Sequence, residues 1–229
     1  SASKSFLTLR GWQGRNAGTQ VTSQYNQISY NHVDGSLSTG TQPFLSLDIA
    51  PQNNSVWEPI ADSIMEGNFV YAHNVGAAYS QLLRVQAARV TYRNNTHYFP
   101  SGMTNSFYGM QISGPSTNTA ACSDSDFLYN SFHVASTATG FTVFTKASGA
   151  GADTRVHGNI AYAPSCTKNG AGSGATPTLY IDASGTFTQA DNSSDSQIKT
   201  VDPLFVGPTT THAGFRLQTG SPYKNAIST

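Results

Sequence analysis

Five short segments of this chain are each built around an asparagine that an aromatic side chain follows within a few residues. Successive asparagines are 27 to 42 residues apart, and one alternating apolar stretch lies between each pair. A unit that recurs at this scale is typical of solenoids, in which equivalent segments stack on one another. The recurring asparagines are Asn26, Asn68, Asn95, Asn130 and Asn159.

Asparagine has a physical reason to recur at a sharp bend. Its backbone tolerates left-handed angles, and its side-chain amide can bond to the same residue one coil away. We therefore expect these asparagines to form a ladder at equivalent bends of successive coils, and not to contact a ligand.

The stretches between the asparagines are short, rich in β-branched and aromatic residues, and alternate with period two, which predicts strands. They cover 44–49, 82–86, 108–112, 141–146 and 179–182, and a similar stretch begins at Phe6. At about 25 to 30 residues per turn, the pattern predicts an all-β parallel β-helix of roughly eight coils. A β-sandwich would need tight hairpin turns, and only Asp34-Gly35 and Asn169-Gly170 supply them.

Composition limits the class of partner. Only 10% of the 229 residues are charged, with 12 basic and 12 acidic side chains, so a basic face for nucleic acid is excluded. The polar side chains are mostly uncharged, which suits hydrogen bonding to sugars. No apolar run reaches the roughly 18 residues of a membrane helix. The two cysteines, Cys122 and Cys166, are spaced for neither a zinc site nor a cysteine-rich scaffold, and a disulfide and two thiols both stay open.

The C-terminal sequence carries a recognisable pattern in three blocks. Asp-Pro-Leu-Phe at 202–205 is followed by Phe-x-Leu at 215–217 and by Gly-Ser-Pro at 220–222. This pattern resembles the closing rung of bacterial and phage right-handed parallel β-helix proteins, a group that includes polysaccharide lyases and to which phage tailspikes are related. The usual Ala-Ile-Asp-Ala-Gly after the last block is replaced by other residues at 223–226.

The resemblance implies one right-handed parallel β-helix domain over 1–229, with 200–229 as closing rung and C-terminal cap. Leu204, Phe205, Phe215 and Leu217 would cover the last open rung. No helix precedes the first strand, so an N-terminal cap is expected to be missing or supplied by another chain. A tailspike-like protein would be secreted or borne on a virion, and would form a homo-oligomer, most simply a trimer, or be attached to another domain.

The outward face of the interposed strands is the expected glycan site. Aligning the strands by their apolar positions, with Leu47, Val85, Met110 and Val143 inward, leaves a mixed polar and aromatic column outward. Rings would cover the apolar face of a sugar, while amides and charged groups would bind its hydroxyls. A register slip of one residue would invert this assignment, and an ordinary solvated face is the alternative. The expected contacts are Asp48, Arg84, Gln86, Gln111, Phe144, Lys146, Tyr180 and Asp182, with Trp57 as a stacking platform in a loop.

Catalysis is less well marked than binding. A polysaccharide lyase needs a base beside a cation, and a glycoside hydrolase needs paired carboxylates. No compact signature of either kind occurs, and the candidates are Arg84, Lys146, Glu66 and Arg93. No metal or cofactor is expected. The sequence therefore predicts a protein that recognises an extracellular or cell-surface polysaccharide and leaves its depolymerisation open. The alternative is a non-catalytic fibre, spike or decoration module that makes protein contacts.

Overall fold

The computed structural model describes residues 7–9, 25–34, 45–47, 61–71, 80–85, 88–101, 107–112, 124–135, 141–146, 153–166, 178–182 and 187–224. Within these residues the chain is mostly β, with 17 short strands, one short α-helix, α1 (Asp195–Thr200), and one 3-10 helix, η1 (His212–Phe215). Neither of these two described helices has the length and apolar character needed to cross a membrane.

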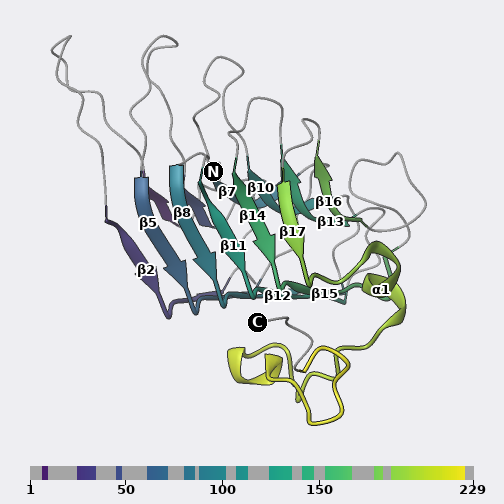
Figure 1. Cartoon of the computed structure of the whole chain (residues 1–229). Helices are drawn as coiled ribbons and strands as arrows, with labels where there is room; N and C mark the ends of the chain where they lie inside the picture. The colour runs from purple at the N-terminus through teal and green to yellow at the C-terminus, as the bar shows by residue number, and fades with distance from the viewer. Residues whose placement is uncertain are drawn as a thin grey trace, which may run out of the picture.

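The described strands form three parallel sheets, here named A, B and C (Figure 1). Sheet A contains, in spatial order, β1 (Leu7–Leu9), β4 (Leu45–Leu47), β7 (Ser80–Val85), β10 (Phe107–Ile112), β13 (Phe141–Lys146) and β16 (Thr178–Asp182). Sheet B contains β2 (Gln27–Ser29), β5 (Ala61–Glu66), β8 (Ala88–Arg93), β11 (Asp126–Leu128), β14 (Thr154–His157) and β17 (Phe187–Ala190). Sheet C contains β3 (His32–Asp34), β6 (Phe69–Tyr71), β9 (Thr96–Phe99), β12 (Ser131–Val134) and β15 (Ile160–Tyr162).

The chain passes through sheets A, B and C in turn, so each strand pairs with the strand three places later. The prediction of an all-β chain is thus confirmed, and the interposed apolar stretches do form one sheet, sheet A. The described residues supply at most six strands to a sheet, where roughly eight coils were expected. One reason is that the repeat between equivalent asparagines is 27 to 37 residues, longer than assumed. The other is that the C-terminal residues leave the sheets.

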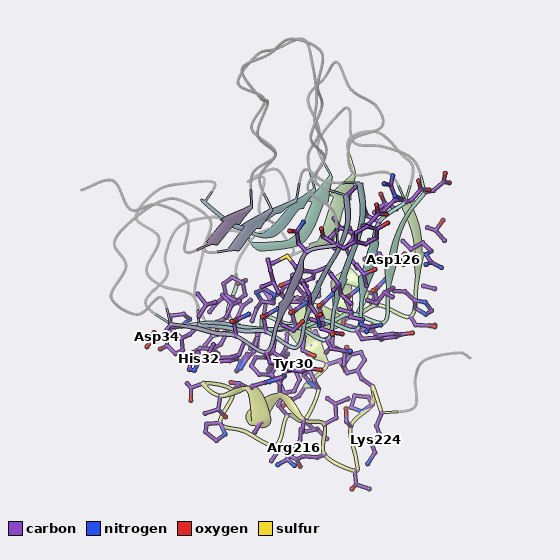
Figure 2. All side chains as sticks on the ribbon, turned by 90° about the vertical axis from the view of Figure 1, so that its left-hand side faces the viewer. Tyr30, His32, Asp34, Asp126, Arg216 and Lys224 are labelled. Atoms are coloured by element: carbon purple, nitrogen blue, oxygen red, sulfur yellow. The ribbon has the colours of Figure 1, made fainter. Side chains whose placement is uncertain are left out.

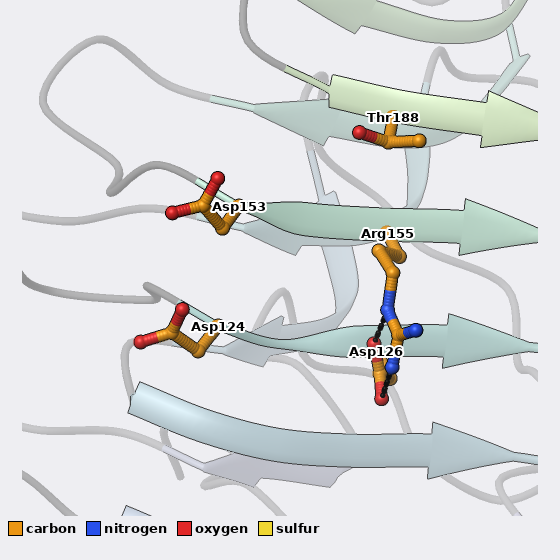
Figure 3. A pocket seen from close by; sticks show the side chains of 5 residues that line it. All are labelled: Asp124, Asp126, Asp153, Arg155 and Thr188. Carbon is orange, nitrogen blue, oxygen red and sulfur yellow. Dashed lines mark hydrogen bonds and ion pairs between the residues drawn. The ribbon is translucent and has the colours of Figure 1, made fainter.

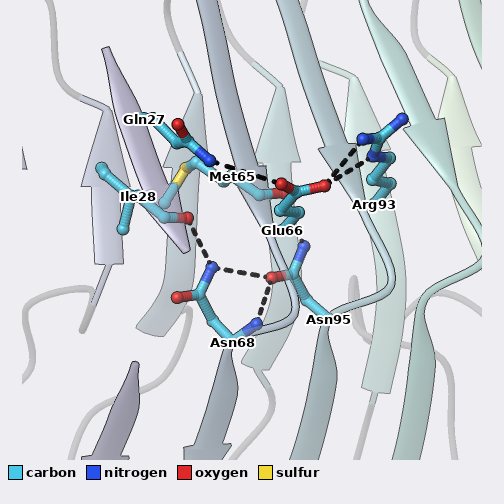
Figure 4. Close-up of polar contacts among 7 residues, drawn as sticks. All are labelled: Gln27, Ile28, Met65, Glu66, Asn68, Arg93 and Asn95. Carbon is cyan, nitrogen blue, oxygen red and sulfur yellow. Dashed lines mark hydrogen bonds and ion pairs between the residues drawn. The ribbon is translucent and has the colours of Figure 1, made fainter. Parts of the chain in front are cut away.

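A ladder of asparagine side chains follows the bend between sheets B and C. Oδ1 of Asn95 accepts hydrogen bonds from the backbone N–H and from Nδ2 of Asn68, both at 2.9 Å (Figure 4). Nδ2 of Asn95 donates to the carbonyl of Met65 at 3.0 Å and to Oδ1 of Asn130 at 3.2 Å. The four buried amides, those of Asn68, Asn95, Asn130 and Asn159, are all saturated in this way, as burial requires. The ladder consists of Asn31, Asn68, Asn95, Asn130, Asn159 and Asn192.

The predicted ladder is confirmed for Asn68, Asn95, Asn130 and Asn159 and is wrong for Asn26. Nδ2 of Asn26 instead donates to Oγ of Ser63 at 3.1 Å, at the opposite end of β2 from the ladder. A following aromatic side chain was the wrong criterion, because Phe, Tyr or Trp follows neither Asn31 nor Asn192 within the next few residues. What the ladder positions share is the residue before them.

That preceding residue always has left-handed backbone angles. In the six ladder rungs its φ lies between 54° and 65°. Glycine, asparagine and aspartate accept this conformation most readily, and four of the six rungs use one of them. Tyr30 and Tyr129 occupy the other two rungs, although a bulky residue is uncommon there. The bend turns the chain sharply from sheet B into sheet C and presents the next asparagine to its neighbours.

The core lies between the sheets and is largely aromatic. Tyr92, Phe127 and Phe132 are fully buried, and the imidazole of His97 stacks on Phe132 with ring centroids 4.7 Å apart. Nε2 of His97 lies within hydrogen-bond distance of the Tyr92 hydroxyl oxygen, at 2.6 Å, whereas Nδ1 of His97 is buried and has no hydrogen-bond partner among the described residues. Burial lowers the pKa of His97 from 6.5 to about 3, so the ring is neutral inside the fold.

Residues 201–224, here called the C-terminal segment, lie against the outer side of sheet C, below it in Figure 1. Phe215 is buried, and its ring centroid is 6.3 Å from that of Phe69 in β6. Further along the sheet, Nδ1 of His133 in β12 lies 2.7 Å from Oγ1 of Thr209. The segment therefore runs back across the sheet toward the first coils.

This position corrects the expected closing rung. Phe205 and Phe215 pack on the face of sheet C, where His133 and Phe69 supply rings that would otherwise meet water, and not on the end of the stack. The end after β15 is occupied by α1, whose Ile198 is fully buried and accepts a hydrogen bond from the Ala163 N–H at 2.7 Å. Leu204 and Leu217 stay half-buried within the C-terminal segment.

Replacing Asn95 by alanine should lower the free energy of unfolding by about 2–4 kcal/mol. The change removes the amide oxygen that accepts two hydrogen bonds from Asn68 and the amide nitrogen that donates to Met65 and Asn130. Buried polar groups of Asn68 and Met65 are then left unpaired. Urea unfolding followed by circular dichroism measures the effect. Asn26→Ala is the matched control, expected to cost at most about 1 kcal/mol because Asn26 lies outside the ladder. Equal losses for the two variants would contradict the ladder's role.

The low pKa of His97 predicts a specific pH dependence of stability. The unfolded chain protonates this group near pH 6.5 and the folded chain only near pH 3, so its contribution to the unfolding free energy is lost progressively as pH falls through that window. His97→Phe should flatten the slope of unfolding free energy against pH between 6.5 and 3. His212→Phe, a change at an exposed histidine, should leave that slope steep. An unchanged slope in His97→Phe would refute the assignment.

Candidate functional site

The glycan column expected on sheet A is not a single column. Strand pairing puts Arg84 beside Gln111, Phe144 beside Tyr180, and Lys146 beside Asp182. These pairs occupy three different register positions, because Phe144, and not Val143, pairs with Met110. The expected alignment was therefore wrong by one residue at β13 and by two residues at β10, where Ile112, and not Met110, pairs with Val85. Residues 143 and 144 are both apolar, so hydrophobicity alone did not fix the register.

The other expected ligand contacts, Asp48, Gln86 and Trp57, lie outside the described residues, as do the side chains of sheet A. The glycan site on that sheet stays a prediction. Of the four catalytic candidates, Arg84 and Lys146 belong to sheet A, whereas Glu66 and Arg93 belong to sheet B.

Glu66 and Arg93 are brought together on neighbouring strands. Their side chains form an ion pair at 2.8 Å, and the amide of Gln27 approaches the other carboxylate oxygen at 3.5 Å (Figure 4). Both groups point away from the core. With its carboxylate already satisfied by Arg93, Glu66 is poorly placed to take a proton from a substrate, and the pair is better explained as a cross-strand contact.

The outward side of sheet B, here called the sheet B face, is lined by charged side chains. Asp62 and Arg89 form a bidentate pair at 2.6 and 2.9 Å, which lowers the pKa of Asp62 and raises that of Arg89. Asp126 and Arg155 form a second bidentate pair, with both bonds at 2.6 Å. Because such exposed pairs contribute little to stability, their number does not explain the fold. They do fix the geometry of the face.

A pocket of about 300 Å³, here called the acidic pocket, opens on this face (Figure 3). It contains three carboxylates, one guanidinium and one hydroxyl group. These five side chains come from the starts of three successive strands of sheet B. The lining residues are Asp124, Asp126, Asp153, Arg155 and Thr188.

Asp124 and Asp153 lie side by side just before two neighbouring strands of sheet B (Figure 3). They precede β11 and β14 at equivalent positions, and neighbouring strands of a sheet are about 4.8 Å apart. Both have left-handed backbone angles, φ 51° and 60°, which aspartate tolerates better than most residues. Both are exposed, and among the described residues neither makes a hydrogen bond or ion pair, although Asp124 interacts electrostatically with Arg89 on the neighbouring strand.

The chemistry of the acidic pocket follows from its excess of carboxylates over cationic groups. Arg155 is held by Asp126 through Nε and one terminal nitrogen, so its remaining N–H donors can still reach a ligand. Asp124 and Asp153 offer four carboxylate oxygens that only accept hydrogen bonds. The pocket therefore suits a ligand rich in hydroxyl or ammonium donors and repels phosphates and carboxylates.

None of the five residues that line the acidic pocket is among the candidate contacts or catalytic groups predicted from the sequence. A usable signal exists: Asp124 and Asp153 each lie six residues before a ladder asparagine. Counting back from the ladder would have placed the two carboxylates in one column.

Neither a metal site nor a reactive thiol marks the described part of the chain. No group of three or more histidine, cysteine, aspartate or glutamate side chains there is placed to hold a metal ion. Cys166 is buried, and burial raises the pKa of its thiol to about 12, which leaves it protonated. Comparison with protein-family models, with curated proteins and with solved structures finds no match for the chain.

Proposed function

We propose that the chain is a right-handed parallel β-helix that binds a polysaccharide along the sheet B face. Two features support the β-helix assignment: the cyclic passage through three parallel sheets and the C-terminal pattern that resembles tailspikes and polysaccharide lyases. The same resemblance supports a secreted or virion-borne protein. We further propose that it acts as a trimer, which sedimentation of the full-length chain at micromolar concentration would test, a stable monomer being the contrary result.

The observation that carries the binding proposal is the pair of exposed carboxylates, Asp124 and Asp153, that make no hydrogen bond or ion pair among the described residues. Sugar hydroxyls donate hydrogen bonds, and a carboxylate accepts them more strongly than a neutral acceptor does. Equivalent side chains recur along the stack at the strand spacing, so the sheet B face offers a periodic row of polar groups to a periodic chain. Tyr25, an exposed tyrosine just before β2, adds aromatic surface for sugar rings.

Charge narrows the glycan class. Three carboxylates against one guanidinium give the acidic pocket a negative excess, and every other described arginine of the sheet B face is paired with an acid. An acidic polysaccharide would be repelled there, whereas a neutral or amino-sugar polymer would be attracted. This differs from an acidic substrate of the kind that polysaccharide lyases cleave.

Binding without cleavage is what the surroundings of the acidic pocket favour. A glycosidase needs one carboxylic acid kept protonated by apolar surroundings, next to a second that is ionised. Asp124 and Asp153 are both exposed, and none of the described residues that line the acidic pocket provides an apolar wall around either of them. Release of reducing ends or unsaturated products from the bound polymer would show that the site is catalytic.

Asp153→Ala should weaken binding to a neutral or amino-sugar polysaccharide by about 1.5–3 kcal/mol, the size of a charge-assisted hydrogen bond. Isothermal titration calorimetry against a panel of neutral, amino-sugar and acidic polymers measures it, with a thermal melt to verify folding. Asp34→Ala is the matched control, because Asp34 is exposed on sheet C, away from the acidic pocket.

Three results would decide against the proposal. Binding to none of the polymers would favour a structural fibre, spike or decoration module. Equal losses in Asp34→Ala and Asp153→Ala would show that net charge, and not the acidic pocket, governs affinity. Tighter binding to acidic polymers than to neutral ones would contradict the assigned glycan class.

A further inference from the structure

A second pocket lies on another side of the molecule, between sheet C and the C-terminal segment. Its volume of about 300 Å³ is at the lower end of the range of about 300–1,000 Å³ that is usual for small-molecule sites. We call it the bend pocket, because the first two coils contribute their bend residues to it. It is lined by Tyr30, Asn31, His32, Gly67, Phe69, Thr211 and His212.

Tyr30 is the unusual residue of the bend pocket. Its φ is 57°, and its side chain is 77% exposed, so no burial offsets the cost of a bulky residue in this conformation. Its ring lies directly over Gly67, where an added Cβ would approach the ring to 2.6 Å. Figure 2 shows Tyr30 and His32 on the side that faces the C-terminal segment, apart from Asp126 of the acidic pocket.

The opposite wall belongs to the C-terminal segment and is held firmly. Thr211 caps η1 by accepting a hydrogen bond from the Gly214 N–H, and the Gly207 N–H donates to the Gly214 carbonyl at 2.9 Å. A Cβ at Gly214 would collide with the Pro208 carbonyl, so only glycine permits this tight path. Phe215 then anchors the segment on Phe69.

Three hydrogen-bonding groups of the bend pocket have no partner among the described residues. They are the hydroxyl of Tyr30 and the ring nitrogens of His32 and His212. The imidazole of His32 meets the edge of Phe69 with centroids 4.9 Å apart, which orients it without using its nitrogens. None of the described residues that line the pocket is an aspartate, glutamate, lysine or arginine. Its walls are therefore aromatic and its free polar groups are uncharged or weakly basic.

We propose that the bend pocket binds one neutral sugar ring. A pyranose has an apolar C–H face for the ring of Tyr30 and hydroxyl groups around its edge for the imidazoles and the tyrosine hydroxyl. A purely apolar ring would leave those three groups unpaired, and a charged ring would find no counter-ion. The site is separate from the sheet B face and does not depend on polysaccharide binding there.

Saturation-transfer NMR with methyl glycosides of neutral hexoses, deoxyhexoses and N-acetylhexosamines tests the proposal. At least one glycoside should bind with a dissociation constant in the millimolar range, and phenol and methyl glucuronide should bind more weakly. Tyr30→Ala and His212→Ala should each weaken that binding by about tenfold or more, which corresponds to about 1.4 kcal/mol. Both residues are exposed, so a thermal melt should show both variants folded.

Gly214→Ala provides an independent variant, because it displaces the wall formed by the C-terminal segment and leaves Tyr30 and His32 in place. It should abolish glycoside binding. Asp153→Ala is the control and should leave binding unchanged, so failure at the bend pocket is distinguishable from failure at the acidic pocket. Absence of binding by every glycoside, preference for phenol, or equal binding by wild type and both Tyr30→Ala and His212→Ala would overturn the proposal.

Discussion

Hydrogen bonding between stacked asparagine amides is the interaction on which the rest of this structure depends. Sheet pairing alone tolerates slippage, because one parallel strand resembles another shifted along it. The amide of Asn95 cannot slip, since its oxygen must meet Asn68 and its nitrogen must meet Met65 and Asn130. The ladder thus sets one residue of every coil, and strands on both sides of it inherit their register. The left-handed residue before each asparagine makes the bend sharp enough for this contact.

Because the strand register is set at the ladder, the number of residues between a side chain and its ladder asparagine determines where that side chain lies on the sheet B face. Residues six positions before it form the column that contains Arg89, Asp124 and Asp153, and residues four before it form the column of Asp126 and Arg155. Chain segments about 30 residues apart thereby bring their charges within contact distance. The acidic pocket exists because two successive coils place an aspartate, and not an arginine, at the same offset.

The sequence was informative where a residue type has one structural use and silent where it has several. Buried asparagines at bends could be recognised from their recurrence, and so could the alternating strands of sheet A. The ladder prediction was wrong for Asn26 because any asparagine near an aromatic residue met the criterion. The predicted alignment of β13 was wrong because Val143 and Phe144 are both apolar. The acidic pocket depends on which residues of successive sheet B strands lie side by side, and the alternation of apolar and polar residues along a single strand does not determine this. The path of the C-terminal segment depends on contacts such as Phe215 with Phe69, far apart in the chain, which no local pattern encodes.

Sheets B and C divide the outer surface by chemistry. On sheet C, Tyr71, Tyr98, His133 and Tyr162 stack in a row with ring centroids 5.3–5.6 Å apart. Removing the apolar surface of such a row from water is favourable, and the C-terminal segment covers part of it. The same burial desolvates His133 and lowers its pKa. On the sheet B face, charged pairs remain in water, where losing one costs little stability. Substitutions there are consequently free to change affinity without unfolding the chain, whereas substitutions on sheet C change packing and the bend pocket together. The bend with the left-handed residue separates these two surfaces, so the ladder of amides keeps the charged sheet B face apart from sheet C, which the C-terminal segment covers in part.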